Sequence, residues 1–189
     1  MGSLGRSVLV TGFPGRQPAV HLVRELVAQG ELSVCCVVTE AREARAIELL
    51  STLPPQARDR VSLWVGDPRS MDLGLSGEEF ARLAEHVEVI HHCGSITVSA
   101  GTPEEAAGNL RAAAEILELA EAAPRLKRLV CWSSATVSGN REGFVKETDL
   151  DDAMGFRNPV EESLYRMERM FGESANELPI VILRPALIV

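Results

Sequence analysis

Two glycines follow a short apolar run near the start of the chain and are spaced to hold a phosphate group. The run 8–10 precedes the turn 11–15, and apolar residues recur at helical spacing from Val20 onward. A strand, a glycine turn and a helix in this order form the pyrophosphate corner of a dinucleotide-binding fold, because the backbone approaches the phosphates and the helix N-terminus favours their charge. Pro18 holds the third glycine position, or Ala19 if one residue is inserted. A strand–turn–helix unit without a ligand is therefore the alternative.

Two other groups of reactive residue types lack the arrangement that their chemistry needs. His91 and His92 are neighbours in an apolar, strand-like run. Their side chains should point to opposite faces of the strand and so should not grip one metal ion. Ser134 lacks the Gly-x-Ser-x-Gly turn of a hydrolase nucleophile. We expect neither a metal centre nor a serine hydrolase.

The composition bears on partners and compartment. The formal net charge is −8, which gives a nucleic-acid partner no electrostatic support. No apolar run approaches the roughly 20 residues of a membrane span. Cys35, Cys36, Cys93 and Cys131 lie in or beside apolar runs and form no Cys-x-x-Cys pair. This pattern predicts reduced thiols in a cytoplasmic protein.

Strand-like and helical patterns alternate along the whole chain. Strands are expected at 8–10, 33–38, 61–65, 87–92, 126–132 and 180–183, and helices from Val20 and at 41–50, 78–84, 103–122 and 159–173. The alternation predicts a parallel sheet with helices on both faces, which is a three-layer doubly wound α/β fold of the Rossmann type. A chain of 189 residues without a linker is expected to form one domain.

Seven separated motifs carry a resemblance to a known superfamily. They are TGFPG (11–15), GD with LGLS (66–67 and 73–76), VIHHCGS (89–95), NLRAA (109–113), SSATVSG (133–139), NPVEESL (158–164) and LRP (183–185). In this order they resemble the extended short-chain dehydrogenases/reductases, which include the NAD-dependent epimerases/dehydratases. The chain looks closest to the thioester-reductase and fatty-acyl-reductase branch. The resemblance implies one NAD(P)-binding domain over residues 1–189.

The resemblance also implies which residues bind the cofactor, either NAD or NADP. Asp67 would accept the adenine amino group, and Cys93, Gly94 and Ser95 would lie under the ribose and nicotinamide. Asn109 would be the structural asparagine of the long helix. The full implied set is Thr11, Gly12, Phe13, Pro14, Gly15, Arg16, Thr39, Glu40, Arg42, Gly66, Asp67, Cys93, Gly94, Ser95, Asn109 and Ser133.

The end of the strand 33–38 leaves the choice of cofactor open. Thr39 takes the place of an arginine that this branch often uses for the 2′-phosphate of NADP. Glu40 would favour NAD by binding the ribose diol, unless it only supplies negative charge at the start of the next helix. Arg42 would meet a 2′-phosphate.

The catalytic pair of the superfamily is replaced. Hydride transfer to a carbonyl needs a proton donor. In the superfamily this donor is a tyrosine assisted by a lysine, in the pattern Tyr-x-x-x-Lys, often after Asn-Pro. The Asn-Pro at 158–159 puts Val160 and Leu164 at those two positions. Ser134 matches the serine that hydrogen-bonds the substrate carbonyl.

A shifted register is the alternative. Tyr165 and Arg169 are also four residues apart and would act as donor and assistant. Tyr165 lies more than one helical turn too far along for the usual spacing from Ser134. A planar guanidinium also fits a lysine pocket poorly. We therefore favour the register of Val160 and Leu164.

Two functional hypotheses follow. The first is a catalytically degenerate domain that keeps a dinucleotide site and serves as a binding or interaction module, with a protein partner or with a homodimer through the helix 103–122 and the helix starting at Pro159. The second is an active NAD(P)H-dependent oxidoreductase that reduces a carbonyl or thioester. In the resembling family, the strand at 180–183 is followed by a further sheet element and a small substrate domain, and we expect this chain to lack both.

Overall fold

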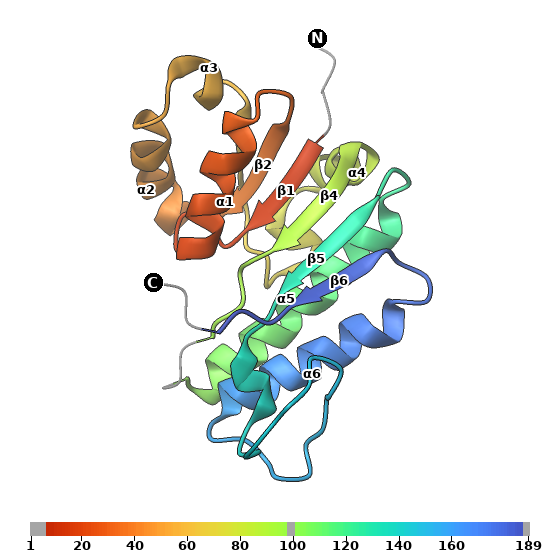
Figure 1. Ribbon diagram of the computed structural model, residues 1–189. Helices are drawn as coiled ribbons and strands as arrows, with labels where there is room; N and C mark the ends of the chain where they lie inside the picture. Colours follow the sequence, from red (N-terminus) through yellow and green to blue (C-terminus); the bar gives the residue numbers. More distant parts are fainter. Residues whose placement is uncertain (1–6, 98–100, 187–189) are drawn as a thin grey trace.

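A computed structural model of the protein describes residues 7–97 and 101–186 (Figure 1). Its centre is a sheet of six parallel strands in the order β3-β2-β1-β4-β5-β6. The strands are β1 (Ser7–Thr11), β2 (Ser33–Val38), β3 (Val61–Val65), β4 (Val87–His92), β5 (Arg128–Trp132) and β6 (Ile180–Leu183). The predicted doubly wound α/β fold is confirmed. Residues 187–189 of the apolar end segment lie outside the described residues.

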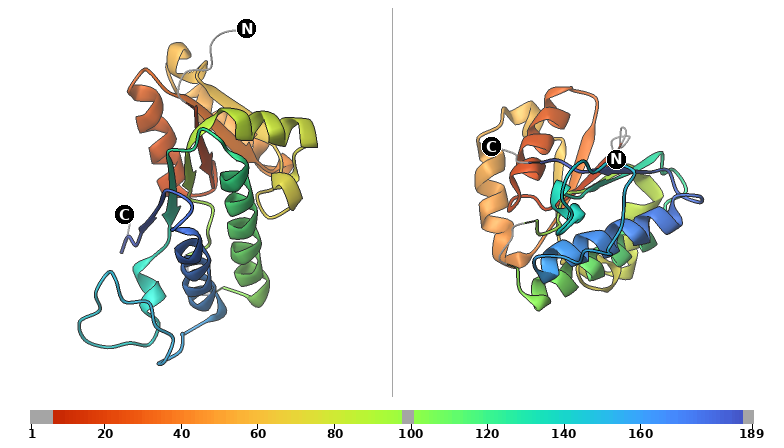
Figure 2. Two further views of the ribbon diagram at one scale, coloured as in Figure 1. Left: turned by 90° about the vertical axis from the view of Figure 1, so that its right-hand side faces the viewer. Right: turned by 60° about the horizontal axis from the view of Figure 1, so that its bottom comes forward.

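Helices cover the sheet on both faces, as the alternation predicted (Figure 2). The first group is α1 (Gln17–Ala28), α2 (Glu40–Ser51) and the short α3 (Pro55–Arg58). The second group, on the opposite face, is α4 (Gly77–His86), α5 (Pro103–Ala122) and α6 (Pro159–Ser174). Two short 3₁₀ helices, η1 (Met71–Gly74) and η2 (Ala135–Ser138), lie in the connections.

Alternate residues of each central strand serve the two faces of the sheet. Leu9 and Ile90 are fully buried in the core that includes α5 and α6 residues. Val10 and Val34 are fully buried in the core that includes α1 and α2 residues. Because strands covered on both faces bury both sets of side chains, they read as continuous apolar runs in the sequence.

Polar caps explain where the two long helices begin. Thr102 accepts a hydrogen bond from the backbone N–H of Glu105, whose carboxylate accepts one from the backbone N–H of Thr102 in return. This capping box satisfies backbone donors that the first helical turn leaves free. Asn158 caps α6 in a similar way, since its side-chain oxygen accepts from the backbone N–H of Glu161 at 3.0 Å.

A buried ion pair ties β6 to α6. The side chain of Glu168 is 0% exposed, and its carboxylate accepts a hydrogen bond of 2.7 Å from Nη2 of Arg184. The same guanidinium donates to the backbone oxygens of Glu147 and Asp149, in the long connection before α6. The pair therefore holds three separate segments together.

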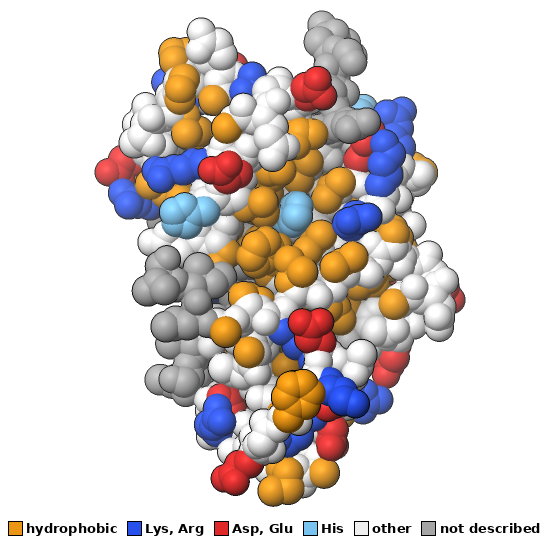
Figure 3. All heavy atoms as spheres, in the orientation of Figure 1, with side chains coloured by type: hydrophobic (Ala, Val, Ile, Leu, Met, Phe, Trp, Pro, Cys, Tyr) orange, Lys and Arg blue, Asp and Glu red, His pale blue; other side chains and the backbone are white. Residues whose placement is uncertain are grey.

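The face of the sheet that carries α1 and α2 is open over β5 and β6. In Figure 1 no described helix lies in front of these strands, and hydrophobic side chains reach the surface there in Figure 3. Within β6, Ile180 and Ile182 pack against the core beside α5 and α6, so Val181 and Leu183 point to the opposite face. Each of these two residues is 38% exposed.

Large exposed hydrophobic residues lie away from the two helices expected to form a dimer. In the described part of the chain they are Ile47, Val65, Met71, Phe144, Met154, Val181 and Leu183, and none belongs to α5 or α6. Within the same residues, no helix has both the length and the apolar character needed to cross a membrane.

Candidate functional site

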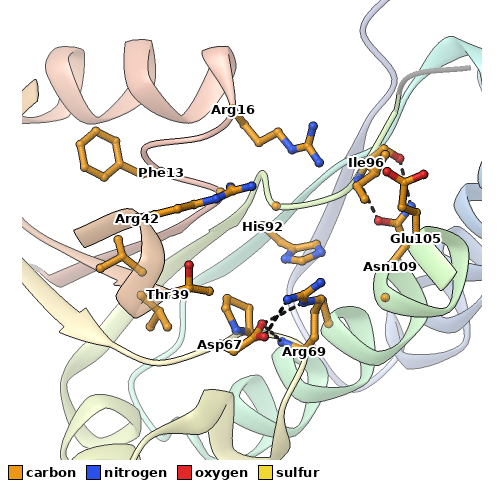
Figure 4. Close-up of a pocket in the computed structure, with 17 residues that line it drawn as sticks. Phe13, Arg16, Thr39, Arg42, Asp67, Arg69, His92, Ile96, Glu105 and Asn109 are labelled. Carbon is orange, nitrogen blue, oxygen red and sulfur yellow. Dashed lines mark hydrogen bonds and ion pairs between the residues drawn. The ribbon is translucent and has the colours of Figure 1, made fainter. Parts of the chain in front are cut away.

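A pocket opens where the order of the strands reverses. The chain order runs outward from β1 to β3 on one side and from β4 to β6 on the other, and the pocket lies at the carboxyl ends of these strands (Figure 4). Open parallel sheets bind ligands at this crossover point. The lining residues are Gly12, Phe13, Arg16, Val37, Val38, Thr39, Arg42, Asp67, Pro68, Arg69, His92, Gly94, Ile96, Glu105, Gly108, Asn109 and Ala112.

The glycine turn has a conformation that a side chain would prevent. Gly12 has a φ of +90°, and a Cβ there would lie 2.6 Å from the backbone oxygen of Cys93. The backbone N–H of Arg16 donates to the carbonyl oxygen of Gly12 at 2.8 Å and closes the turn. Pro18 sits in the first turn of α1, where proline costs no hydrogen bond. Ala19 is fully buried, so it is the small residue that packs closely against the sheet.

Two guanidinium groups lie beside this turn without a close ion pair to any described residue. The guanidinium of Arg42 lies directly over Gly15, where any side chain would collide with it. Arg16 and Arg42 both line the pocket, and neither forms an ion pair with any described residue. Burial lowers the pKa of Arg16, the nearby charge of Arg42 lowers that pKa further, and the charge of Glu105 partly offsets these effects. Two repelling cations at a glycine turn favour the binding of an anion.

A third arginine, Arg69, is held in place by Asp67, the residue predicted to accept the adenine amino group. Arg69 donates to both carboxylate oxygens of Asp67, from Nε at 3.0 Å and from Nη2 at 2.8 Å. The hydrogen bonds from Arg69 lower the pKa of Asp67. The Arg69 side chain crosses Gly108 of α5, where a Cβ would lie 3.3 Å from its Cδ. Asp67 therefore reaches the pocket as one half of a planar ion pair.

A buried histidine joins the ends of β1 and β4. His92 Nδ1 lies 3.0 Å from Thr11 Oγ1, and its Nε2 lies 3.2 Å from Ser95 Oγ. Burial lowers the pKa of His92 to about 4, so the ring is neutral at physiological pH. Thr11 Oγ1 also accepts from the backbone N–H of Gly94 at 3.2 Å. This network positions the floor of the pocket.

Asn109 positions the chain that leaves β4. Its Oδ1 accepts from the backbone N–H of Ile96 at 2.8 Å, and its Nδ2 donates to the Ile96 carbonyl at 3.0 Å. The same Nδ2 donates to Ser163 Oγ of α6, also at 3.0 Å. One buried amide thus links the pocket wall, α5 and α6.

The retained serine Ser134, the two positions of the lost catalytic pair and the alternative donor Tyr165 all lie outside the pocket lining. Val160 and Leu164 are both fully buried, and Leu164 belongs to the core beside α5 and α6. Ser134 Oγ accepts from the backbone N–H of Thr136 at 3.2 Å, which caps η2. Tyr165 is buried against Phe156, with their ring centres 5.2 Å apart.

The structure brings together about half of the predicted cofactor residues at the pocket surface. These are Gly12, Phe13, Arg16, Thr39, Arg42, Asp67, Gly94 and Asn109. The remaining ones, which are absent from the lining, are Thr11, Pro14, Gly15, Glu40, Gly66, Cys93, Ser95 and Ser133. Glu40 is exposed at the start of α2, whereas Ser133 is buried and its hydroxyl has no hydrogen-bond partner among the described residues.

Sequence reasoning missed several residues that line the pocket. The charged ones are Arg69 and Glu105, and His92 was considered only as a metal ligand. One signal was present: Glu105, Gly108, Asn109 and Ala112 have the spacing of a single helix face. Since Asn109 was already expected at the site, its neighbours on that face were candidates too. The described residues contain no group of acidic, histidine and cysteine side chains able to hold a metal ion.

The fold and the pocket define a Rossmann domain whose glycine turn and arginines suit a phosphate-bearing nucleotide. Residues 10–189 match the model of an NAD-binding family described as Male sterility protein. The chain belongs to this family, and with it to the extended short-chain dehydrogenases/reductases, as the motifs predicted.

Similarities to known proteins support this family assignment. The chain is 30% identical over 161 residues to the isonitrile lipopeptide synthase of Mycobacterium tuberculosis, a match that covers 77% of this chain and 6% of the synthase. The terminal R domain of the myxalamid PKS-NRPS biosynthetic pathway is 27% identical, with a TM-score of 0.81 over 98% of this chain and 50% of that chain.

Two more distant structures share the fold. The reductase (R) domain of a non-ribosomal peptide synthetase from Mycobacterium tuberculosis is 23% identical, with a TM-score of 0.78 over 97% of this chain and 48% of that chain. The UDP-glucuronic acid 4-epimerase of Bacillus cereus, solved with NAD, is 20% identical, with a TM-score of 0.73 over 95% and 56%. This chain therefore spans about half the length of these solved structures.

Proposed function

We propose that this domain binds NADP(H) and does not transfer hydride, so that it serves as a nucleotide-binding or interaction module. The observation that carries the proposal is the pair of guanidinium groups, Arg16 and Arg42, beside the glycine turn, neither of which forms a close ion pair with a described residue. The residues fit the cofactor: Gly12 leaves the turn bare, and the start of α1 faces the same space. Arginine and a helix N-terminus together recognise phosphate oxygens.

The charges at the end of β2 support NADP over NAD. Glu40 is the residue that would bind a free ribose diol, but it is exposed and absent from the pocket lining. Thr39 and Arg42 both line the pocket, one turn of helix apart. An arginine with no counter-ion among the described residues gains from a ligand that carries a 2′-phosphate.

The lack of a proton donor supports the degenerate reading. NADPH, when bound, would supply a hydride from its nicotinamide ring, and the product alkoxide would need a proton. Val160 and Leu164 have no ionisable proton to donate and are fully buried. Tyr165 is buried against Phe156, interacts with Arg169 and is absent from the pocket lining. Within residues 7–97 and 101–186, no contact favours Tyr165 as a substitute proton donor.

The proposed role as an interaction module includes a homodimer in which α6 would lie at the interface. Its outward face carries two ion pairs, Arg166 with Glu162 and Arg169 with Glu173. A homodimer through α5 and α6 would therefore be held mainly by polar contacts and would weaken as salt is added. All four cysteines are free and buried, in keeping with the cytoplasm as the compartment.

An activity assay separates this proposal from an active oxidoreductase. The purified chain is incubated with NADPH and a panel of aldehydes and thioesters, and loss of NADPH absorbance is followed. We expect no turnover in the native protein or in Tyr165→Phe. Turnover that is present in the native protein and absent in Tyr165→Phe would establish the second hypothesis. Turnover that survives in Tyr165→Phe would also contradict the proposal.

A further inference from the structure

The short η1 contains a left-handed turn, residues 72–74, that side chains rarely adopt. Asp72 has a φ of +53° and a ψ of +29°, and Leu73 has a φ of +59° and a ψ of +20°. Gly74 follows with a φ of +69°. In this region the Cβ atom crowds the backbone, so two successive residues with side chains are unfavourable there unless contacts from elsewhere hold them. The left-handed turn therefore needs support from the surrounding structure.

The left-handed turn packs directly against the residues that follow β3. A Cβ at Gly66 would lie 2.5 Å from the carbonyl oxygen of Leu73, and a Cβ at Gly74 would lie 2.7 Å from the backbone nitrogen of Asp67. Asp67 in turn reaches the pocket, where it pairs with Arg69 (Figure 4). Because the backbones approach each other so closely, a shift of the turn would move Asp67.

The carboxylate of Glu115, on α5, supplies the support. Its Oε2 atom is buried and has no hydrogen-bond partner among the described residues, so the carboxylate points into the molecule. Burial raises the pKa of Glu115 and the charges of Glu118 and Asp72 raise it further, whereas hydrogen bonds from the backbone N–H groups of Asp72 and Leu73 lower it. Successive N–H groups of a turn form a concave site for an anion. Glu115 is the anion at this one.

One face of α5 carries both the pocket wall and Glu115. Glu105, Gly108 and Ala112 line the pocket. Glu115 follows Ala112 by three residues, which places it on the same face about one turn further along the helix. A partly desolvated carboxylate beside two like charges is unfavourable by itself. What Glu115 provides instead is a link between the left-handed turn and the helix that forms one wall of the pocket.

We infer that Glu115 is a positioning residue for base recognition: its carboxylate holds the left-handed turn, and the turn holds Asp67 where it accepts the adenine amino group. This inference rests on the proposed function and on the contact between Asp67 and adenine that the family resemblance implies. It extends that function to a residue that does not line the pocket. Since the arginines that face the phosphates lie elsewhere, Glu115 sets the preference for the base and leaves phosphate binding unchanged.

The preference for the base is a readout that overall stability does not move. NADP⁺ and deamino-NADP⁺ differ only in the base, where hypoxanthine has an oxygen in place of the amino group. Calorimetry gives both dissociation constants for the native chain, for Glu115→Ala and for the matched control Glu121→Ala, an exposed acidic residue of the same helix. The native chain and the control should bind NADP⁺ at least about tenfold more tightly than the analogue, because a hydrogen bond to a charged group is lost. In Glu115→Ala this ratio should fall below about threefold, with the affinity for the analogue unchanged within about threefold.

Two further variants separate the carboxylate from its packing. Glu115→Gln keeps an oxygen that accepts from the left-handed turn, so it should retain a ratio of at least about fivefold. Glu115→Met fills similar space without an oxygen and should lose the ratio as alanine does. The methionine variant keeps the test decisive if Glu115→Ala does not unfold cooperatively on heating.

The other outcomes separate the inference from the proposed function. A native ratio in Glu115→Ala or Glu115→Met, or an equal loss of affinity for both nucleotides, would overturn the inference while the proposed function stands. A native chain without any preference for adenine would also overturn it, because Asp67 would not read the base. If the native chain binds neither nucleotide, the proposed function fails and the inference falls with it.

Discussion

Replacing Arg42 by glutamine tests the electrostatic argument at the site. Its guanidinium lies over Gly15, lines the pocket and has no ion-pair partner among the described residues. A charge-assisted hydrogen bond from arginine to phosphate contributes about 1.5–3 kcal/mol. Arg42→Gln should therefore raise the dissociation constant of NADPH by roughly 10- to 150-fold. NADH has no 2′-phosphate, so its affinity should change by less than about threefold.

Calorimetric titration of the native protein, Arg42→Gln and the control Arg45→Gln measures these constants directly. Thermal unfolding gives a second readout, because NADPH at about 100 times its dissociation constant adds about 2.7 kcal/mol of stability. For a domain of this size that increment raises the melting temperature by roughly 5–10 °C. Equal losses for NADPH and NADH would mean that Arg42 contacts the pyrophosphate. No loss for either would refute the role given to Arg42.

Three further predictions concern buried groups. Glu168→Ala leaves the largely buried Arg184 without its counter-ion. The free energy of unfolding, measured in urea, should therefore fall by about 3 kcal/mol. An unchanged urea midpoint would contradict this prediction. His92 has a folded pKa of about 4 against 6.5 in the unfolded chain, so the unfolded state binds more protons between these values. The free energy of unfolding should fall by up to about 3 kcal/mol as the pH drops from 6.5 to 4. His92→Asn should flatten this pH dependence. An equal slope of stability against pH in the variant would rule out His92 as the cause. Leu164→Lys buries a charge and should destabilise the protein by at least about 3 kcal/mol, whereas a variant of native stability would mean that position 164 opens to water.

The fold was predictable because its signals are local. Apolar runs of four to six residues alternate with helical patterns, and proline or a capping residue marks the start of both α5 and α6. The errors in the sequence prediction concern a short helix and the boundaries of elements. The short α3 has no counterpart among the expected helices; it begins at Pro55, where proline at the first position is favourable. The strand expected from residue 126 begins at Arg128.

The phosphate corner was predictable for the same reason, since a turn and the helix after it are contiguous in sequence. The contacts that need side-chain direction were not. Glu40 and Arg42 are two residues apart, so they point to different sides of α2, and only Arg42 reaches the pocket. The Arg69 side chain that pairs with Asp67 passes close to Gly108, which is distant in sequence. The sequence contains these residues without indicating that they meet.

The most direct test of the account is a calorimetric titration of the cofactor-stripped protein with NADPH and, separately, with NADH. The account predicts micromolar binding of NADPH and at least about tenfold weaker binding of NADH. Tighter binding of NADH would contradict the role of Arg16 and Arg42. Absence of binding by both nucleotides at millimolar concentration would contradict the central claim that this domain binds a dinucleotide at its glycine turn.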